Sequence, residues 1–374
     1  MGIATCEVPE FASLAAVIER LAANSDVLLI FRAPVAEQVV DLARRVAPLT
    51  PILLHTVDLH FLRMHREATL SGDEAAAAIA MEMRATELNL IARVDATIVV
   101  SSYEKELLDN LVPGAKVHHI PIIREVPQLP AAPGWRGLLE RSLARLRGRD
   151  NAATDHLVWT FEKRRDLLFI GNYLHQPNVD AVLWFARAVW PRVLAHGFRD
   201  RLIIAGPYAP ATISGLASDR IKILGHVGDL GSLFAACRLS VAPLRYGGGA
   251  KGKIVTSLSY GVPVVATTLA IEGMGLTPEN DVLVADTPDR LADQIVRLYS
   301  DSFLWQQLST AGYKTFASTF SEAASAPTLL ALLDSFVAPT PRRGIGRLIS
   351  FARAARARQT GSCGRRASGN SDHH

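Results

Sequence analysis

The stretch that decides the fold is Leu239–Gly273, which reads LSVAPLRYGGGAKGKIVTSLSYGVPVVATTLAIEG. It opens with an apolar run typical of a buried parallel strand. Three glycines follow at 247–249, and the pattern predicts a helix that starts near Ala250. Glycines here let backbone amides approach a ligand, and a helix N-terminus adds partial positive charge. With Lys251 and Lys253, these features predict an anion site of diphosphate size; a glycine-rich surface turn with solvated lysines is the alternative.

Residues 247–253 also match G-x-x-x-x-G-K, the spacing of the phosphate-binding loop in nucleoside triphosphatases. That loop needs Ser or Thr as its next residue, to hold Mg²⁺, and this chain has Ile254 there. A dinucleotide site has no direct support either, because no G-x-G-x-x-G follows a strand-like run. The sequence therefore argues against a triphosphatase.

Short apolar runs alternate with helical patterns on both sides of this stretch. The strand-like runs are 27–31, 51–55, 96–101, 116–121, 166–170, 201–205, 221–224, 239–243, 262–267 and 281–285. The clearest helical pattern is Asp180–Leu194, for which Asn178 is the expected N-terminal cap. Alternation of this kind predicts an α/β protein with parallel sheets.

A chain of 374 residues has room for two or three domains, and its composition shifts over residues 126–165. Prolines there give way to an arginine-rich stretch, which indicates a connection between two α/β domains. We predict a reduced, incomplete Rossmann-like N-terminal domain over 1–125 and a linker or insertion over 126–165. A Rossmann-like C-terminal domain over 166–336 and a basic, disordered tail over 337–374 complete the prediction.

The positive charge of the chain is concentrated in the tail. Residues 341–374 contain eight arginines and one aspartate, which gives them a charge of +7. Because the whole chain has a net charge of +4, the first 340 residues carry −3. Those residues contain no basic stripe interleaved with aromatic side chains, so we expect no nucleic-acid partner. The tail can form a membrane-surface helix with Ile345, Leu348 and Ile349 on one face; a solvated basic tail is the alternative.

The cysteines and the N-terminus favour a reducing compartment. Cys6, Cys237 and Cys363 lie far apart and have neither metal-binding nor disulfide spacing. No stretch reaches about 18 consecutive apolar residues, and the first ten residues have no basic region of a secretory signal. We therefore expect a cytoplasmic protein without a metal site, with peripheral attachment to the inner membrane face through the tail as an option.

The run GGGAKGKIVTSLSYGVPVVATTLAIEGM resembles the donor-binding region of group 1 glycosyltransferases. The stretches LLFIGNYLHQPNVDAVLWF, RLIIAGPY and IKILGHVGDLGSLFAACRLSVAPL resemble earlier parts of the same domain. HTVDLHFLRMHREA and ELNLIARVDATIVVSSYEKELL resemble the end of the acceptor-side domain. The likeness covers about Val27 to Leu333 apart from 126–165. It rests on all these stretches occurring in the same order as in the family.

The resemblance implies the GT-B architecture, in which two Rossmann-like domains with parallel sheets face a cleft. It implies a retaining hexosyltransferase that moves a sugar from a nucleotide-diphosphate donor to a glycan or lipid-linked acceptor, with no metal or other cofactor. Lysines and helix dipoles would stabilise the leaving group, and no D-x-D triplet is present. The implied donor residues are Gly171 and Asn172 at the phosphates, His226 and Val227 near the base, Gly249, Lys251 and Lys253 at the diphosphate, and Glu272 and Gly273 beside the ribose or sugar.

Two departures from the family pattern bear on activity. The family commonly has two glutamates eight positions apart in the donor loop and helix, where this chain has Gly248 and Thr256. Thr256 offers a ribose hydroxyl one neutral hydrogen bond instead of a charged acceptor. The family's first strand and glycine loop have no counterpart before Val27. The first alternative is therefore a degenerate, non-catalytic homologue that binds a nucleotide sugar or a partner protein; an epimerase or phosphorylase of the same fold is the second.

Asp58 and His60 are the candidate catalytic residues, since the family often places a histidine or aspartate near the reacting sugar at this point. A helix-capping aspartate beside a surface histidine is the alternative. We predict that His55 is a packed strand residue and that Arg63 is a solvated helix residue, with a phosphate contact as the alternative for Arg63. Glu104 falls in the first turn of a helix that Ser101 or Ser102 would cap, and we assign it no catalytic role.

Overall fold

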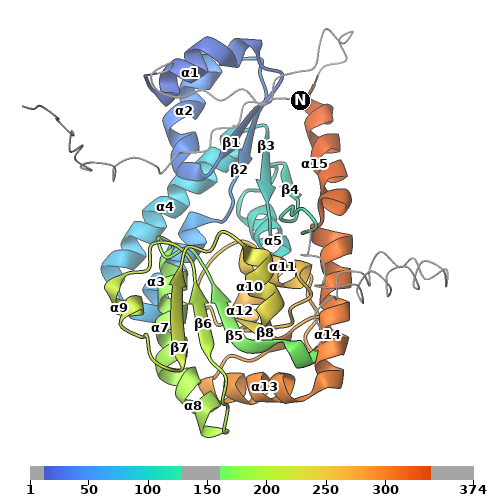
Figure 1. The fold of residues 1–374 in the computed structure, drawn as a ribbon. Helices are drawn as coiled ribbons and strands as arrows, with labels where there is room; N and C mark the ends of the chain where they lie inside the picture. The colour runs from blue at the N-terminus through green and yellow to red at the C-terminus, as the bar shows by residue number, and fades with distance from the viewer. Residues whose placement is uncertain (1–11, 128–160, 338–374) are drawn as a thin grey trace, which may run out of the picture.

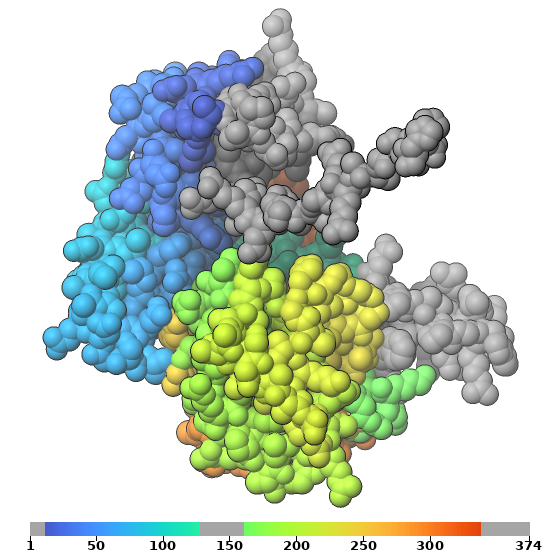
Figure 2. All heavy atoms as spheres, turned by 60° about the vertical axis from the view of Figure 1, so that its left-hand side comes forward, coloured from blue at the N-terminus to red at the C-terminus, as the bar shows by residue number. Residues whose placement is uncertain are grey.

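The computed structural model of the chain describes residues 12–127 and 161–337. Two α/β domains, each built on a parallel sheet, lie one above the other (Figure 1). The space-filling view shows the N-terminal domain, in blue and cyan, resting on the green and yellow C-terminal domain (Figure 2). The prediction of an α/β fold with two parallel-sheet domains is confirmed.

The N-terminal sheet has four parallel strands in the order β1-β2-β3-β4. Its strands are β1 (Leu28–Phe31), β2 (Ile52–His55), β3 (Ala96–Val99) and β4 (Val117–His119). Its helices are α1 (Leu14–Leu21), α2 (Ala33–Val46), α3 (His60–Ser71), α4 (Glu74–Arg93) and α5 (Ser102–Leu111). Every residue of β3 is buried, as expected for a strand covered by helices on both faces.

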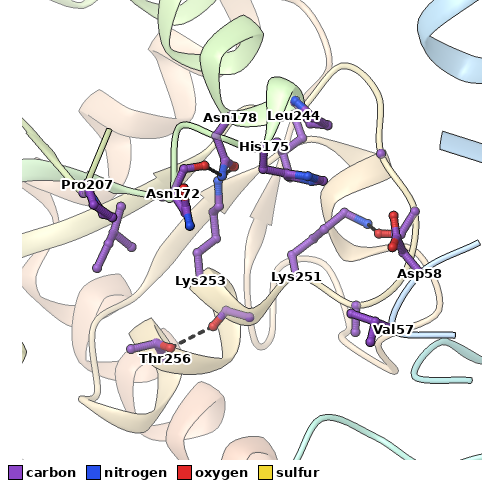
Figure 3. Close-up of a pocket in the computed structure, with 18 of the residues that line it drawn as sticks. Val57, Asp58, Asn172, His175, Asn178, Pro207, Leu244, Lys251, Lys253 and Thr256 are labelled. Carbon is purple, nitrogen blue, oxygen red and sulfur yellow. Dashed lines mark hydrogen bonds between the residues drawn. The ribbon is translucent and has the colours of Figure 1, made fainter. Parts of the chain in front are cut away.

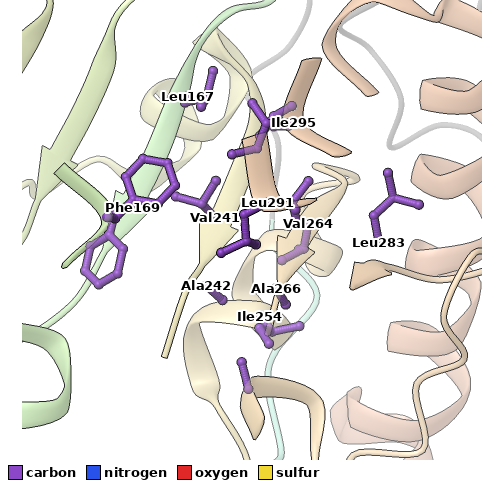
Figure 4. Close-up of a cluster of buried hydrophobic side chains, with 14 of the residues drawn as sticks. Leu167, Phe169, Val241, Ala242, Ile254, Val264, Ala266, Leu283, Leu291 and Ile295 are labelled. Carbon is purple, nitrogen blue, oxygen red and sulfur yellow. The ribbon is translucent and has the colours of Figure 1, made fainter. Parts of the chain in front are cut away.

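The C-terminal sheet has six strands in the order β10-β9-β8-β5-β6-β7. The strands are β5 (Arg165–Ile170), β6 (Leu202–Ala205), β7 (Ile221–Gly225), β8 (Cys237–Ala242), β9 (Val264–Ala266) and β10 (Leu283–Val284). The helices are α7 (Gln176–Trp184), α8 (Trp190–Ala195), α9 (Ala211–Ser214), α10 (Leu230–Ala236), α11 (Gly252–Ser259), α12 (Thr268–Ile271), α13 (Pro288–Ser300), α14 (Ser302–Thr315) and α15 (Glu322–Phe336). Figure 4 shows the core, where Val241 and Val264 from the sheet meet Ile254 of α11 and Leu291 of α13.

Each of the ten predicted strand runs overlaps a strand, but the predicted cap of the long helix is wrong. The helix starts at Gln176, four residues earlier than expected, and continues through a π-helical turn into α8. Pro177 occupies the first turn, where proline costs no hydrogen bond, so His175 is the N-cap residue. Asn178 therefore lies inside the first turn, and its side-chain amide donates to the Asn172 carbonyl at 2.7 Å.

The last helix, α15, returns to the N-terminal domain (Figure 1). Leu333 belongs to a buried cluster with Ile98 of β3, and Phe336 packs against that cluster. At the start of α15, Arg124 N donates to the Phe320 carbonyl at 2.8 Å, and Glu322 N donates to the Arg124 carbonyl at 3.0 Å. Arg124, near the end of the first described range, thus lies beside the start of α15.

The predicted domain boundaries remain a prediction, and the structure adds that α15, within the predicted C-terminal domain, packs on the N-terminal sheet. Most of the predicted linker and nearly all of the predicted tail lie outside the described residues. Over the two described ranges, no helix combines the length and the apolar character that a membrane crossing requires.

Candidate active site

A cavity of about 590 Å³ lies between the two domains. Its lining comes from segments that follow β1, β2, β5, β6, β7 and β8, so the carboxyl ends of both sheets face it. Ligands of open α/β sheets bind at this end of the strands, and the volume suits a small organic ligand. The sequence-predicted residues that line it are Asp58, His60, Gly171, Asn172, His226, Val227, Lys251, Lys253 and Thr256.

Lys253 and Lys251 form a cationic wall on the C-terminal side. Lys253 Nζ donates to Asn178 Oδ1 at 2.6 Å and lies 4.2 Å from the centre of the Phe169 ring. Lys251 is buried, and its Nζ donates to the Gly248 carbonyl at 3.0 Å. Figure 3 shows Lys253 directed towards Asn178 and Lys251 facing Asp58 across the site. The alternative of solvated lysines on a surface turn is therefore wrong.

Burial lowers the pKa of both ammonium groups. The pKa of Lys253 falls to about 7 through burial, with the charge of Lys251 adding to the shift. Burial lowers the pKa of Lys251 to about 8, against the opposing pull of the Glu104 and Glu272 carboxylates. Buried ammonium groups lack the solvation that stabilises their charge. An anionic ligand would supply the missing negative charge and raise both pKa values, so this wall favours an anion.

The N-terminus of α11 adds to this positive wall. The helix begins at Gly252 directly after Lys251, and no side chain among the described residues caps its first turn. Its first N–H groups are thus available to a ligand. A Cβ placed on Gly252 would lie 3.1 Å from Arg124 Nη2, so the Arg124 guanidinium stands beside this helix start and lines the cavity. The sequence around Arg124 did not identify it as a site residue, because its position depends on backbone hydrogen bonds to Phe320 and Glu322, far along the chain.

Thr256 lines the cavity from α11, but its hydroxyl is already engaged. Thr256 Oγ1 donates to the Gly252 carbonyl of its own helix at 2.8 Å. A threonine hydroxyl retains lone pairs for a ligand donor. Thr256 is therefore placed to accept one hydrogen bond and offers no charge.

Three of the sequence-predicted donor residues lie in the contact between the domains, outside the cavity lining. Gly249 N donates to Glu104 Oε1 at 2.7 Å, so this amide does not point to a diphosphate. Glu272 forms an ion pair with Arg66 of α3 at 2.8 Å. The Gly273 carbonyl accepts from Ser102 N at 3.0 Å. Gly249 was expected at the diphosphate, and Glu272 and Gly273 beside the ribose or sugar. The structure instead places all three in contacts that hold the domains together.

Asp58 and Arg63 form a pair on the N-terminal wall, with 2.8 Å between Arg63 Nε and Asp58 Oδ2. Burial alone would raise the pKa of Asp58, but the charges of Arg63 and His60 outweigh it and hold that pKa below its usual value. The prediction of a solvated Arg63 is wrong, because its side chain is 18% exposed and lines the cavity. The capping alternative for Asp58 is also wrong, because Leu59 is the N-cap residue of α3.

Glu87 of α4 holds the start of α3 and with it His60. Its carboxylate accepts from the backbone N–H of His60 at 3.1 Å and of Phe61 at 2.7 Å. His60 Nδ1 lies 3.3 Å from Glu87 Oε1, and the His60 side chain is 14% exposed. A buried carboxylate thus fixes the backbone of His60 and approaches its ring. The sequence did not single out Glu87, because it lies 27 residues further along the chain.

Two further cavity residues were not identified from the sequence. His175 lies at the start of α7, and burial, aided by the charge of Arg63, lowers its pKa to about 4. Its imidazole is therefore neutral at pH 7 and can exchange hydrogen bonds with a neutral hydroxyl. Arg32 lies at the end of β1, at the N-cap of α2, and has a φ of 71°. A strained non-glycine residue beside a cavity is typical of functional sites.

Val57 is also in the left-handed region, with a φ of 68°, which is rare for a β-branched residue. Val57 N donates to His55 Nδ1 at 3.1 Å, and burial lowers the pKa of His55 to about 4. The His55 ring stacks on Phe31, with the ring centres 4.9 Å apart. His55 is thus confirmed as a packed strand residue. It holds the turn that directs Asp58 into the cavity.

Comparison with known proteins agrees with this geometry. The family described as "Glycosyl transferases group 1" matches residues 164–301, which confirms the resemblance stated from the sequence. No curated protein sequence matches the chain.

Solved structures share the fold. HepE of Anabaena, in complex with UDP and glucose, is 16% identical with a TM-score of 0.60, over 86% of this chain and 81% of HepE. Sucrose-phosphate synthase of Thermosynechococcus elongatus is 16% identical with a TM-score of 0.66, over 87% and 79%. The α,α-trehalose 6-phosphate synthase of Burkholderia multivorans is 14% identical with a TM-score of 0.59, over 88% and 76%. These likenesses establish the predicted two-domain GT-B fold.

Proposed function

We propose that the chain, whose residues 164–301 match the group 1 glycosyltransferase model, transfers a hexose from a nucleotide-diphosphate donor to a glycan or lipid-linked acceptor. The observation that carries the proposal is the charge of the cavity: Lys251, Lys253 and Arg124 surround one helix start, and Asp58 and His60 face them. HepE, which shares the fold, has been solved with UDP and glucose.

The donor would lie on the C-terminal wall. We assign its diphosphate to Lys251, Lys253 and the N–H groups of α11, with Gly171 and Asn172 close to the phosphates. The base would lie near His226 and Val227, beyond β7. Thr256 would accept a single hydrogen bond from the donor.

During transfer the bond between the anomeric carbon and the diphosphate oxygen breaks, and the acceptor oxygen bonds to that carbon. The leaving diphosphate gains negative charge, which the two lysines, Arg124 and the α11 dipole would stabilise without a metal. Asp58 and His60 would hold the sugar and the acceptor hydroxyl so that the acceptor oxygen approaches from the face from which the diphosphate leaves, and the departing diphosphate would take the acceptor proton. Retention of configuration at the anomeric carbon is part of the proposal.

The direct test is calorimetric titration of the purified protein with UDP, GDP and ADP, with and without Mg²⁺. Micromolar binding of one nucleotide, unchanged by Mg²⁺, is the expected result and would identify the base. A folded protein that binds none of them would contradict the assignment of the donor site. Incubation with the matching nucleotide sugar and candidate acceptors, followed by NMR of the product, would then report transfer and anomeric configuration.

One observation favours a second candidate, a homologue that binds a nucleotide sugar without transferring it. Thr256 and Gly248 provide no carboxylate at two positions where the family commonly has one, and Thr256 Oγ1 is bonded to its own helix. Such a protein would bind the nucleotide in the titration but would form no product with any acceptor. We expect the protein to act in the cytoplasm, with the basic tail as the candidate for contact with a membrane.

A further inference from the structure

The buried carboxylate of Glu104 joins segments of the two domains. Glu104 lies in the first turn of α5 and is 1% exposed. Its Oε1 accepts from Leu59 N, in the N-terminal domain, at 3.1 Å and from Gly249 N, in the C-terminal domain, at 2.7 Å. Both amides are buried with it, so removing the carboxyl group would leave two N–H groups without this acceptor.

The segments that Glu104 joins are in direct contact. A Cβ on Gly249 would lie 2.6 Å from the Val57 carbonyl, and a Cβ on Gly248 would lie 3.2 Å from the Leu59 carbonyl and 3.4 Å from Glu104 Oε1. The same helix start makes a second contact between the domains, from Ser102 N to the Gly273 carbonyl at 3.0 Å. The N-terminus of α5 is thus fitted to the closed arrangement of the domains.

We propose that Glu104 is a positioning residue for the transfer reaction, which holds the donor loop 247–249 against residues 57–59 of the N-terminal domain. The proposal rests on the proposed function. Leu59 lies between Asp58 and His60, and Gly249 lies two residues before Lys251. One carboxyl group therefore sets the separation between the candidate catalytic residues and the diphosphate site.

The protonated form of Glu104 suits this role. Burial raises the pKa of Glu104 to about 7, although the hydrogen bonds from Leu59 and Gly249 oppose the shift. Of the charged groups that face it, Asp58 raises this pKa further and Lys251 lowers it. Its second oxygen, Oε2, has no hydrogen-bond partner among the described residues, so little in the closed state stabilises a charge there. The neutral carboxyl can still accept both N–H groups through Oε1.

Because the closed state raises this pKa, closure takes up a proton. The contact is fully stabilised when Glu104 is protonated, below its ordinary pKa of 4.5, and weakens as the pH rises through about 7. Glutamine has the shape of the protonated acid and does not titrate. Glu104→Gln should therefore keep the contact at all pH values, and Glu104→Ala should lose it.

The test compares the full-length chain with Glu104→Ala, Glu104→Gln and the matched control Glu106→Ala, which removes an exposed carboxylate from the same helix. Spin labels on Glu82→Cys and Asp219→Cys, one exposed position in each domain, report the distance between the domains. Cys6 and Cys363 are replaced by serine in all four proteins. At low pH we expect a longer, broader distance distribution for Glu104→Ala alone. As the pH rises from about 4.5 to about 7, the wild-type distribution should broaden while that of Glu104→Gln does not.

Kinetics provide the second measurement. Glu104→Ala should lower kcat at least tenfold and change the Kd for the nucleotide less than threefold, with Glu104→Gln close to wild type. Unchanged distances and kcat in Glu104→Ala, or a Glu104→Gln variant as impaired as it, would overturn the proposal. If the wild-type chain binds no nucleotide, the proposed function fails, and the spin-label distances still decide the role of Glu104. If Glu104→Ala does not fold, the pH dependence of wild type against Glu104→Gln decides it.

Discussion

The two walls of the cavity are built differently. We call the C-terminal wall, to which we assign the donor, the donor wall, and the N-terminal wall the acceptor wall. The cationic part of the donor wall takes Lys251, Lys253 and Thr256 from one short stretch at the start of α11. The acceptor wall takes its residues from separate places along the chain, with Arg32 after β1 and Asp58 after β2. A site made by one turn of chain can be recognised from its sequence, whereas a site assembled from distant segments depends on contacts that only the fold provides.

The sharpest test of this division is to remove the charges of the donor wall. Lys251→Ala combined with Lys253→Ala should weaken UDP binding by about a hundredfold or more, because each charge-assisted hydrogen bond contributes roughly 1.5–3 kcal/mol. Calorimetry measures the loss, and circular dichroism checks the fold. Lys222→Ala, an exposed lysine of β7, is the control. Equal affinity in the double variant and the control would remove the diphosphate from this wall.

A change on the acceptor wall should affect turnover instead of binding. His60→Ala should lower kcat about a hundredfold, since a misplacement of the reacting groups by about 1 Å can cost ~10²-fold. The Kd for the nucleotide should stay within about threefold, because the donor binds to the other wall. His118→Ala, on β4 and outside the cavity lining, is the control. A variant that keeps its kcat would exclude His60 from the reaction.

The contact between the walls can be tested at Gly249. Alanine at a φ of +60° costs about 1–2 kcal/mol in any protein, and here its Cβ would also lie 2.6 Å from the Val57 carbonyl. Gly275 has a φ of +68° with nothing within 4 Å of its Cβ, so Gly275→Ala isolates the conformational cost. Chemical denaturation should show Gly249→Ala as the less stable variant by at least 1 kcal/mol. Equal stabilities would mean that the close approach to Val57 is not tight in solution.

The smallest expected effect is a pH dependence that belongs to the donor wall alone. The pKa values of about 7 for Lys253 and about 8 for Lys251 mean that the empty site loses protons as the pH rises through this range. An anion binds the protonated form, so nucleotide affinity should fall several-fold between pH 7 and 9. The unliganded fold should change the other way, because lysines with lowered pKa values destabilise it as the pH falls through 8 and 7. Titrations at fixed ionic strength and urea unfolding over the same range measure the two trends. A flat affinity profile would contradict the lysine assignment.

The sequence predicted the strands and the pair of lysines that line the cavity, but not the contact between the domains. The lysines were found because glycines, a strand end and a helix start lie within one window. Glu104 was interpreted as an ordinary first-turn residue, and Glu272 was assigned to the ribose or sugar. Both carboxylates instead cross to the other domain, to Gly249 and to Arg66. Such partners lie 145 and 206 residues apart, and local patterns carry no information about pairs at that separation.

The contact between Arg124 and the start of α15 has a mechanical consequence. If the two domains rotated about this contact, displacement would grow with distance from it. Arg124 lies at the contact and also stands beside the first turn of α11, so such a rotation would move it little. Asp58 and His60 lie on a separate segment of the moving wall and would travel further. On the proposed function, the phosphates would therefore stay in place during such a rotation while the acceptor side opens and closes.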